Sequence, residues 1–434
     1  MNYLADELNS LLEGTVAGRL LSPLGRRLYF PQGIIAQGAE AKEKAHKANA
    51  TIGMAYHQGK PLMLSAIGDQ VPGLKPEEAV AYAPTAGIQA VRTAWKDRIL
   101  RHNPGLSPEN LSLPVVVPGL TAGIAYMADL FLGEGDPILL SSPCWDNYEL
   151  IFQERRGAVL REIPFFGETW GLDMSAIRNA LEGAAKTGTT VRLILNFPHN
   201  PSGYAPTAAE AAALLACIRK IAQDGTDVLV LCDDAYFGLF YEGDCLKESL
   251  FSGLAQAHPR ILAVKIDGPT KEDYVWGFRM GFITFGSQGL QERQYEGLVK
   301  KLMGAIRSSV SCANTPAQYL LLKTLEDERS KAEKEQYHTL LQKRYRRVKA
   351  LLDAHPAHPY LRPLPFNSGY FMTFRCTGIG AEALRQELLT KHGIGTISFG
   401  ETYLRVAFAS MDEEQIPGVY QDIYDAARDL GAGI

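Results

Sequence analysis

The sequence of 434 residues predicts an α/β fold built on a mostly parallel sheet with helices on both faces. Three observations lead to this prediction. Between Leu113 and about Phe285, short apolar runs alternate with segments that carry apolar residues at helical spacing. The sequence shows no repeat, low-complexity tract or Ser/Gly linker. The chain is also longer than one hydrophobic core usually spans, so we expect two domains.

Six apolar runs are the predicted strands of this sheet. In chain order they read PVVVPG, DPILLSSP, VRLILNFP, DVLVLCDD, RILAVKID and MGFITFG. Two of the predicted helices between them read TAGIAYMADLFLG and TAAEAAALLACIRKIAQ. Ligands of such sheets bind beyond the carboxyl ends of the strands, and the polar motifs of this chain all come directly after strands.

The C-terminal part begins with a long charged helix, predicted over residues 329–355, which links the large domain to the rest of the C-terminal part. Two further strand-like stretches are GYFMTFRC and YLRVAFAS. The first sixty residues are less regular, and we expect them to pack against this part. The sequence therefore predicts a small domain of residues 1–60 and 325–434 and a large domain of residues 61–324.

Composition argues against several classes of protein. With 46% hydrophobic and 21% charged residues, the chain is typical of a soluble globular protein, and its net charge of -4 offers no basic field for nucleic acid or anionic membrane. The N-terminus has early acids and no long apolar core, and no run reaches the ~18 apolar residues that span a bilayer, so neither a signal peptide nor a membrane span is predicted. Six scattered cysteines without CxxC, and histidines without HExxH, favour reduced thiols in a cytoplasmic protein without a metal.

A single lysine carries the most informative segment. Lys271 follows an apolar strand and a Gly-Pro turn in the run ILAVKIDGPTKEDYVWGFRMGF, and Arg279 comes eight residues later. A deprotonated lysine amine can form an imine with an aldehyde. Most lysines at strand ends are solvated surface charges, so the interpretation of Lys271 as an imine-forming residue depends on the motifs upstream.

Two polar turns follow the preceding strands. Asn200 stands in NFPHNPSG, a tight turn that presents an amide side chain, although an ordinary turn explains it equally well. Asp233 comes at the end of VLVLC, where a partly buried carboxylate needs a partner. Tyr236 follows three residues later. A helix cap or turn acid remains open for Asp233, and a core tyrosine for Tyr236.

Two weaker motifs lie earlier in the chain. VPGLTAGIAY joins a strand to a helix, and Gly119, Leu120 and Thr121 would open that helix, where free N–H groups and the helix dipole favour a phosphate. SSPCWDNYELIF offers Trp145 as a flat apolar surface for stacking on a ring, with core packing as an equally good reading.

Taken in order, these segments resemble class I aminotransferases dependent on pyridoxal phosphate (PLP), and the aspartate/aromatic branch in particular. The shared order is a helix-opening glycine, SPxW, NPxG, DxAY, the lysine, an arginine eight residues later and a late arginine in a strand. It extends over residues near 30 to 420. The resemblance implies the PLP-dependent transferase fold of type I, with a smaller α+β domain formed by both termini, and a homodimer with shared active sites.

The resemblance also implies roles for the cofactor site. Lys271 corresponds to the Schiff-base lysine, and Asp233 to the partner of the ring nitrogen. Asn200 and Tyr236 contact the phenolic oxygen, and Trp145 stacks on the ring. The phosphate would be held by a further group: Gly119, Leu120, Thr121, Arg279 and, reaching across from the other subunit, Tyr82.

Substrate contacts are implied by the same resemblance. Gly53, in NATIGMAYHQGKP, would lie near the substrate carboxylate, and Trp145 and Asn200 would also contact the substrate. Arg405, in YLRVAF, matches the arginine that grips the α-carboxylate, a task that its planar fork suits. Arg307 stands near the place where aspartate-type enzymes carry an arginine for the side-chain carboxylate.

The sequence departs from the family pattern in three places. Gly268 stands where the family usually has a serine or threonine that donates to the phosphate, so this hydrogen bond is lost or is replaced by Thr270 or water. The acidic pair Glu272 and Asp273 directly after the lysine is unusual. The spacing around Arg307 is longer than in the closest relatives.

We therefore expect a homodimeric PLP-dependent aminotransferase that moves an amino group from an L-amino acid to a 2-oxo acid through Lys271. Aspartate, glutamate or an aromatic amino acid is the expected donor. A C–S lyase or a decarboxylase on the same scaffold is the nearest alternative, because fold does not fix chemistry. A non-enzymatic PLP-binding regulator would need a DNA-binding segment, and no basic helix-turn-helix precedes residue 30. A nucleotide-binding protein would carry GxGxxG or a Walker loop, and the sequence has neither.

Overall fold

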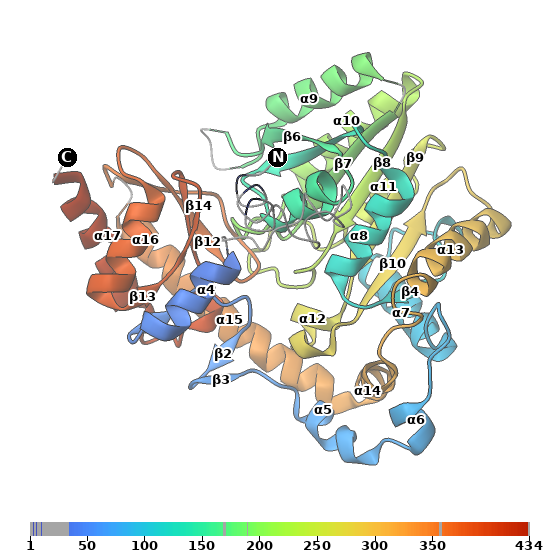
Figure 1. The fold of residues 1–434 in the computed structure, drawn as a ribbon, viewed down its shortest axis with the longest axis horizontal. Helices are drawn as coiled ribbons and strands as arrows, with labels where there is room; N and C mark the ends of the chain where they lie inside the picture. Colours follow the sequence, from blue (N-terminus) through green and yellow to red (C-terminus); the bar gives the residue numbers. More distant parts are fainter. Residues whose placement is uncertain are drawn as a thin grey trace.

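A seven-stranded mixed sheet forms the larger part of the molecule in the computed structural model, which describes residues 3, 6, 10, 34–167, 171–188, 190–355 and 358–432. Figure 1 shows this sheet with helices on both faces. In order across the sheet, its strands are β4 (Val115–Val117), β10 (Gly281–Gly286), β9 (Ile261–Asp267), β8 (Asp227–Asp233), β7 (Thr190–Asn196), β5 (Pro137–Ser142) and β6 (Val159–Pro164).

Six of these strands run in the same direction, five of them as adjacent parallel neighbours, and β10 runs antiparallel to β4 and β9. All six strands predicted from apolar runs are confirmed. The seventh strand, β6, was not predicted because it lies at the sheet edge and its residues VLREIP are mostly half-buried or exposed. Its sequence therefore lacks the continuous apolar run of a strand buried on both faces.

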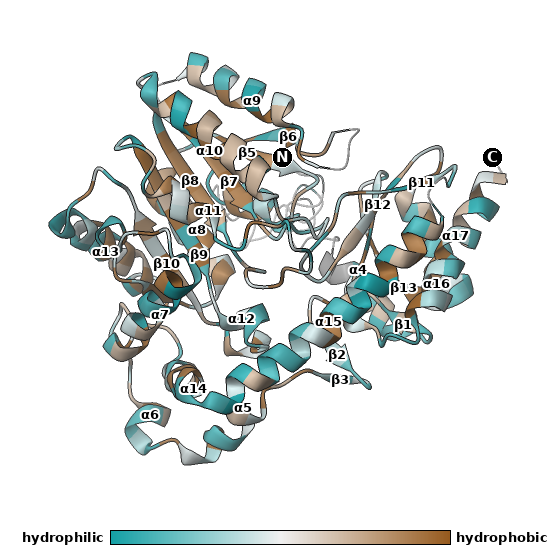
Figure 2. Ribbon diagram, turned by 180° about the vertical axis from the view of Figure 1, so that it is seen from behind, coloured by the Kyte–Doolittle hydropathy of each residue, from teal (hydrophilic) through white to brown (hydrophobic). Residues whose placement is uncertain are grey.

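Alternate residues of the strands belong to two different apolar cores, one on each face of the sheet. One core is covered by helices that include α7 (Gln89–His102), α9 (Met174–Thr187), α10 (Ala208–Gln223), α11 (Leu250–Leu254) and α14 (Thr315–Glu326). The other is covered by α8 (Leu120–Phe131), α13 (Glu292–Arg307) and the π-helix η3 (Glu149–Glu154). Figure 2 shows the hydrophobic residues gathered on the central strands.

A second, antiparallel sheet lies apart from the first (Figure 1), in the order β11 (Leu361–Pro363), β12 (Met372–Cys376), β15 (Tyr403–Val406) and β14 (Ile397–Phe399). Helices α16 (Ala381–His392) and α17 (Ile416–Ala432) pack with it in a third core. This core also takes in Ala48, Ala50 and Ala55, as expected for the first sixty residues, and it extends to Leu62, Leu64 and Ile67, which the prediction placed in the large domain. The domain boundaries stay a prediction, and most of residues 1–33 lie outside the described part.

The long charged helix is α15 (Glu328–Ala354), within one residue of its predicted bounds. It runs from the larger part of the molecule to the smaller sheet, and hydrophilic residues cover much of its length (Figure 2). No helix in the described part is long and apolar enough to cross a membrane. The six cysteines are unpaired.

Shorter elements complete the described chain. They are α4 (Ile34–Lys44), β1 (Ala48–Asn49), β2 (Tyr56–His57), β3 (Lys60–Pro61), α5 (Ser65–Gln70), η1 (Val71–Gly73), α6 (Pro76–Val80), η2 (Pro108–Asn110), α12 (Pro269–Glu272), η4 (Trp276–Phe278), β13 (Ile394–Gly395) and η5 (Phe408–Ser410). The strand β1 pairs with β13 in parallel, which ties the N-terminal segment to the C-terminal part.

Candidate active site

Three neighbouring strands bring the predicted catalytic residues to one edge of the large sheet. Asn200 follows β7, Asp233 ends β8, and Lys271 follows β9 on the short helix α12. These strands are adjacent and parallel, so the residues that follow them meet at the carboxyl edge. The Lys271 amine lies 5.1 Å from the ring centre of Tyr236.

Burial shifts the Lys271 amine towards its neutral, nucleophilic form. Burial lowers the pKa of Lys271 to about 8, Asp233 opposes this shift, and Arg279 adds to it. The backbone beside the amine is also fixed, because the Tyr370 hydroxyl donates to the Lys271 carbonyl at 3.0 Å. A larger fraction of this lysine is therefore deprotonated near neutral pH than of an ordinary lysine.

Asp233 is a buried carboxylate, 4% exposed. Burial raises the pKa of Asp233 to about 6, and the hydrogen bond from Tyr148 and the charge of Lys271 act against this shift. The Tyr148 hydroxyl donates to the carboxylate at 2.6 Å, and the Ala235 amide donates at 3.3 Å. Sequence reasoning missed Tyr148, although it stands three residues after Trp145 in the same motif.

Arg405 is a buried cation, 2% exposed, next to Asn200. Its guanidinium donates to the Asn200 side-chain oxygen at 3.0 Å and to the Thr51 carbonyl at 3.1 Å. Its Nε has no hydrogen-bond partner, and no carboxylate lies within ion-pair distance, among the residues that the structure describes. Burial lowers the pKa of Arg405 to about 10. A buried guanidinium that has no carboxylate partner is destabilising unless an anion binds to it.

Two aromatic side chains, Phe371 and Tyr236, form an aromatic wall between Arg405 and Lys271. Phe371 lies under the Arg405 guanidinium at 4.1 Å from ring centre to Cζ. Tyr236 meets Phe371 edge-on, with 5.5 Å between the ring centres. A Cβ placed on Gly53 would lie 3.9 Å from the Phe371 ring, so the structure brings Gly53 to the same wall. Sequence reasoning did not single out Phe371.

The predicted phosphate residues also come together. Gly119 caps the N-terminus of α8 with a φ of 91°, and Leu120 and Thr121 form the first turn of this helix. A Cβ on Gly119 would lie only 2.7 Å from an Arg279 guanidinium nitrogen. The free N–H groups of a 12-residue helix and a guanidinium thus face the same space, which suits a phosphate.

The structure explains why glycine occupies position 268. A Cβ there would come 3.0 Å from the Gly281 Cα and 3.0 Å from the Met280 carbonyl oxygen. A serine or threonine of the family pattern would therefore need this backbone to shift by a few tenths of an ångström. Thr270 is buried and its hydroxyl is directed at the Met280 carbonyl, at 3.4 Å.

The remaining predicted residues lie at the edge of this group or away from it. Trp145 is half-buried and meets edge-on, at 5.5 Å, the ring of Tyr148, the tyrosine that donates to Asp233. Tyr82 is 92% exposed, and Arg307 is exposed at the end of α13. Neither contacts the residues above in the part of the chain that the structure describes, and the roles of both stay predictions.

Comparisons with known proteins agree with this geometry. The family described as aminotransferase class I and II matches residues 56–423. The arginine–pyruvate transaminase of Pseudomonas aeruginosa is 25% identical over 389 residues, 86% of this chain and 89% of that protein. The aspartate/prephenate aminotransferase of Thermus thermophilus is 25% identical over 342 residues, covering 76% of this chain and 80% of its own. An aminotransferase structure from Anaerococcus prevotii superimposes with a TM-score of 0.82 at 21% identity, over 92% of this chain and 98% of that one.

Proposed function

The chain belongs to the class I and II aminotransferases, which depend on PLP, and we propose that it transfers the amino group of an L-amino acid to a 2-oxo acid through Lys271. Aspartate, glutamate or an aromatic amino acid is the proposed donor. The observation that carries this proposal is Arg405, a buried guanidinium beside Asn200 with no carboxylate at ion-pair distance among the described residues. Every amino acid and 2-oxo acid brings a carboxylate that could fill this position.

The residues present fit PLP at both of its charged ends. The α8 N-terminus and Arg279 suit its phosphate, and a Cβ on Gly119 would fill the space in front of that arginine. The buried carboxylate of Asp233 suits the protonated ring nitrogen. When bound, PLP supplies an electron sink for the negative charge that develops at the substrate Cα.

Side chains of this protein are assigned the roles in binding the cofactor and in proton transfer. Asp233 would face the ring nitrogen of the cofactor and favour its protonated form. Asn200 and Tyr236 would bind its phenolic oxygen, and Trp145 would pack against its ring. Lys271 would hold the aldehyde group of the cofactor, and its amine, when free, would be the base that takes the proton from the substrate Cα. Its lowered pKa favours the neutral form that this step needs.

A homodimer is part of the proposal. Several large apolar side chains are exposed on the segment 63–82, with values of 55% for Met63, 52% for Val71 and 85% for Val80. Tyr82, which would reach the phosphate of the partner subunit, belongs to the same segment and is 92% exposed. A second copy of the chain would cover this apolar surface.

A panel of amino donors tests the proposal, with 2-oxoglutarate and oxaloacetate as acceptors. The panel includes aspartate, glutamate, tyrosine, phenylalanine and arginine, because the relatives named above act on chemically different amino acids. We expect turnover only when a 2-oxo acid is present. Product formation from an amino acid alone would favour a C–S lyase or a decarboxylase on the same fold.

A further inference from the structure

An apolar cavity opens at the amino-terminal edge of the large sheet, the edge opposite the candidate active site. Its volume is about 670 Å³, which is typical of sites that hold small molecules. Residues at the starts of β7, β8 and β9 line it, among them Thr190, Val228 and Ile261. Asp227 and Asp233 are the two ends of β8, so roughly 20 Å of strand separates this cavity from the candidate catalytic residues.

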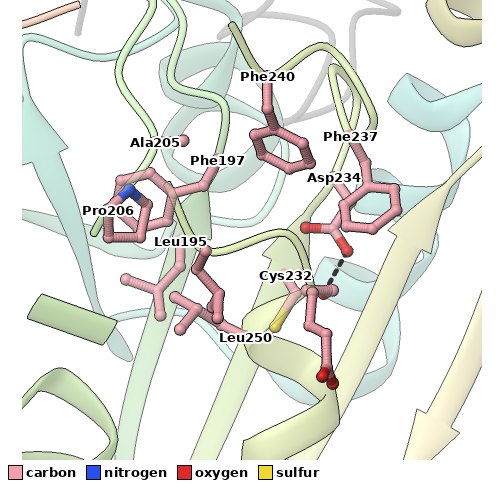
Figure 3. Close-up of a pocket in the computed structure, with 12 residues that line it drawn as sticks. Leu195, Phe197, Ala205, Pro206, Cys232, Asp234, Phe237, Phe240 and Leu250 are labelled. Atoms are coloured by element: carbon pink, nitrogen blue, oxygen red, sulfur yellow. Dashed lines mark hydrogen bonds between the residues drawn. The ribbon is translucent and has the colours of Figure 1, made fainter. Parts of the chain in front are cut away.

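A second cavity, at the carboxyl edge of the same sheet, offers no comparable space. Figure 3 shows it beside Asp234 and Phe237, which follow β8. Its volume of about 10 Å³ is room for a single water molecule. The Ser249 hydroxyl donates to Asp234 at 2.6 Å and Lys265 contacts the same carboxylate, so the acid in this cavity already has partners. Of the two cavities, only the one at the amino-terminal edge has room for an organic ligand.

Half-buried apolar side chains form much of the wall of the larger cavity. Phe131 comes from the end of α8 and Leu262 from β9, while Leu290 and Leu298 belong to the chain that enters and forms α13. All four pack on one side against the apolar core beneath α8 and α13, and their other side faces the cavity. An apolar ligand that covers these side chains removes their surface from water, which is favourable.

One face of α13 completes the wall. Gln294, Gly297, Leu298 and Lys301 follow one another at helical spacing, and all four line the cavity. A Cβ built on Gly297 would meet no atom within 4 Å. Glycine is unfavourable in a helix interior and no close neighbour requires it at this position, so its effect is to leave the cavity open.

Basic side chains surround the apolar wall. Arg192, Arg260 and Lys301 line the cavity, against a single acid, Asp227. Arg260 lies 2.8 Å from Asp227, and Arg192 lies 3.1 Å from Asp136. Lys301 is exposed and has no carboxylate at ion-pair distance among the residues that the structure describes. Two of the three cations are therefore paired, and the third is available to an anion.

We propose that this cavity binds a free amphiphile with one anionic group, of which a medium-chain fatty carboxylate is the simplest example. The apolar tail lies against Phe131, Leu262 and Leu298, and the anionic head group meets Lys301. The occupant is a soluble molecule and not a membrane, because the chain has a net charge of -4 and offers no basic field to an anionic surface. The site is separate from Lys271, so the proposal does not depend on the reaction proposed above.

Decanoate is the probe, titrated by calorimetry into the full-length protein loaded with PLP. One decanoate should bind per chain. Across octanoate, decanoate and dodecanoate, each added CH₂ group should raise the affinity about fourfold, because it takes further apolar surface out of water. Decylammonium has a similar tail and the opposite charge, and it should bind more weakly than decanoate.

Two substitutions test the wall and the charge separately. Gly297→Trp fills the cavity and should lower the affinity for decanoate by at least about tenfold. Gly183→Trp, at an exposed glycine of α9 whose Cβ also meets no atom within 4 Å, is the matched control and should bind like wild type. Lys301→Glu should weaken decanoate about tenfold and strengthen decylammonium. Lost packing alone would weaken both probes.

Arg405→Leu separates this cavity from the active site, where the buried guanidinium is a second possible partner for a carboxylate. Binding that persists in Arg405→Leu supports the proposal, and binding that is lost there but kept in Gly297→Trp overturns it. If Gly297→Trp does not fold, the opposite changes expected for the two probes in Lys301→Glu decide the question.

Three further results would overturn the proposal. The first is the absence of binding at all three chain lengths. The second is association with phosphatidylglycerol vesicles without binding of free decanoate, which would make the surface a membrane contact. The third is a smaller assembly of Gly297→Trp than of wild type in sedimentation, which would make this face of α13 an interface between copies of the chain.

Discussion

The Tyr148 hydroxyl donates a 2.6 Å hydrogen bond to the carboxylate of Asp233, and both side chains are buried. Burial raises the pKa of Asp233 to about 6, and Tyr148 is the largest of the influences that hold it down. The anion that would face the ring nitrogen of PLP thus depends on a tyrosine from a different strand end.

Tyr148→Phe should make the ionised form of Asp233 less stable. Loss of a hydrogen bond to a buried charged group costs roughly 1.5–3 kcal/mol of stability. The pKa of Asp233 should rise further above 6, so a larger fraction is protonated at any given pH. We expect kcat/KM to fall more at about pH 6 than at about pH 8, measured as a pH profile. Tyr126→Phe, which loses a 2.7 Å contact with Ser309 away from the site, is the control, and equal profiles for both variants would contradict this role.

Lys271 should make stability depend on pH in a defined window. Burial lowers its pKa from 10.5 to about 8, so between these values the unfolded chain binds more protons than the folded chain. The stability of the PLP-free protein therefore falls as the pH drops from 10.5 to 8 and stays lower below that. Lys271→Met should be more stable than wild type at about pH 7, with an advantage that shrinks towards pH 10.5 in urea unfolding. The same advantage at both ends of the window would count against a lowered pKa.

Gly268→Ser should not restore the phosphate contact of the family pattern. Its Cβ would meet the backbone of Gly281 and Met280 at 3.0 Å, and backbone cannot move aside as a flexible side chain can. We expect a loss of stability of roughly 1–3 kcal/mol and no gain in PLP affinity. Thermal unfolding and PLP titration measure the two effects. Gly277→Ser, where a Cβ meets nothing within 4 Å, is the matched control. Tighter PLP binding in Gly268→Ser would show that the site tolerates a hydroxyl.

Arg405→Leu should lower kcat/KM for all donors alike, because each carries the α-carboxylate. A charge-assisted hydrogen bond is worth roughly 1.5–3 kcal/mol, or about ten- to a hundredfold. Arg307→Leu should lower kcat/KM only for aspartate and glutamate and spare tyrosine and phenylalanine. Equal losses for acidic and aromatic donors in Arg307→Leu would mean that another residue reads the side-chain carboxylate.

Mixing experiments address the shared active site. If Tyr82 reaches the partner's phosphate, a heterodimer of Tyr82→Phe and Lys271→Ala chains has one doubly altered site and one intact site. Sedimentation should show a dimer, and activity should recover when the two inactive or weakened proteins are mixed. Subunit exchange without recovery would refute this sharing.

Local patterns sufficed to predict most of the fold and to select the candidate site residues. Apolar runs revealed the buried strands of the large sheet. The order of short motifs selected Lys271, Asp233 and Asn200 as candidate site residues, and the structure brings the three to one sheet edge. The half-exposed edge strand β6 carried no comparable pattern.

Long-range contacts account for the features that the sequence did not predict. Arg98 meets Asp273 across 175 positions of the chain, and Tyr148 meets Asp233 across 85, so no local spacing connects them. Gly268 is a departure from a family pattern in the sequence, and only the close approach of Gly281 and Met280 explains it. The acidic pair after the lysine is visible in the sequence, but its partners lie on α7 and α15.

The ion pairs that Glu272 and Asp273, at the end of α12, form with Arg98 and Lys334 have a consequence for protein engineering. Glu272 and Asp273, Arg98 and Lys334 come from three separate stretches of the chain, yet their charges cancel only as a set. A chimera that imports the lysine segment of another aminotransferase, without acids after the lysine, would leave Arg98 as a buried cation without its anions, at a cost of roughly 3–5 kcal/mol. The transferable unit is therefore the lysine segment together with the arginine face of α7 and the first turns of α15, and evolutionary replacement of any one member favours compensating changes in the others.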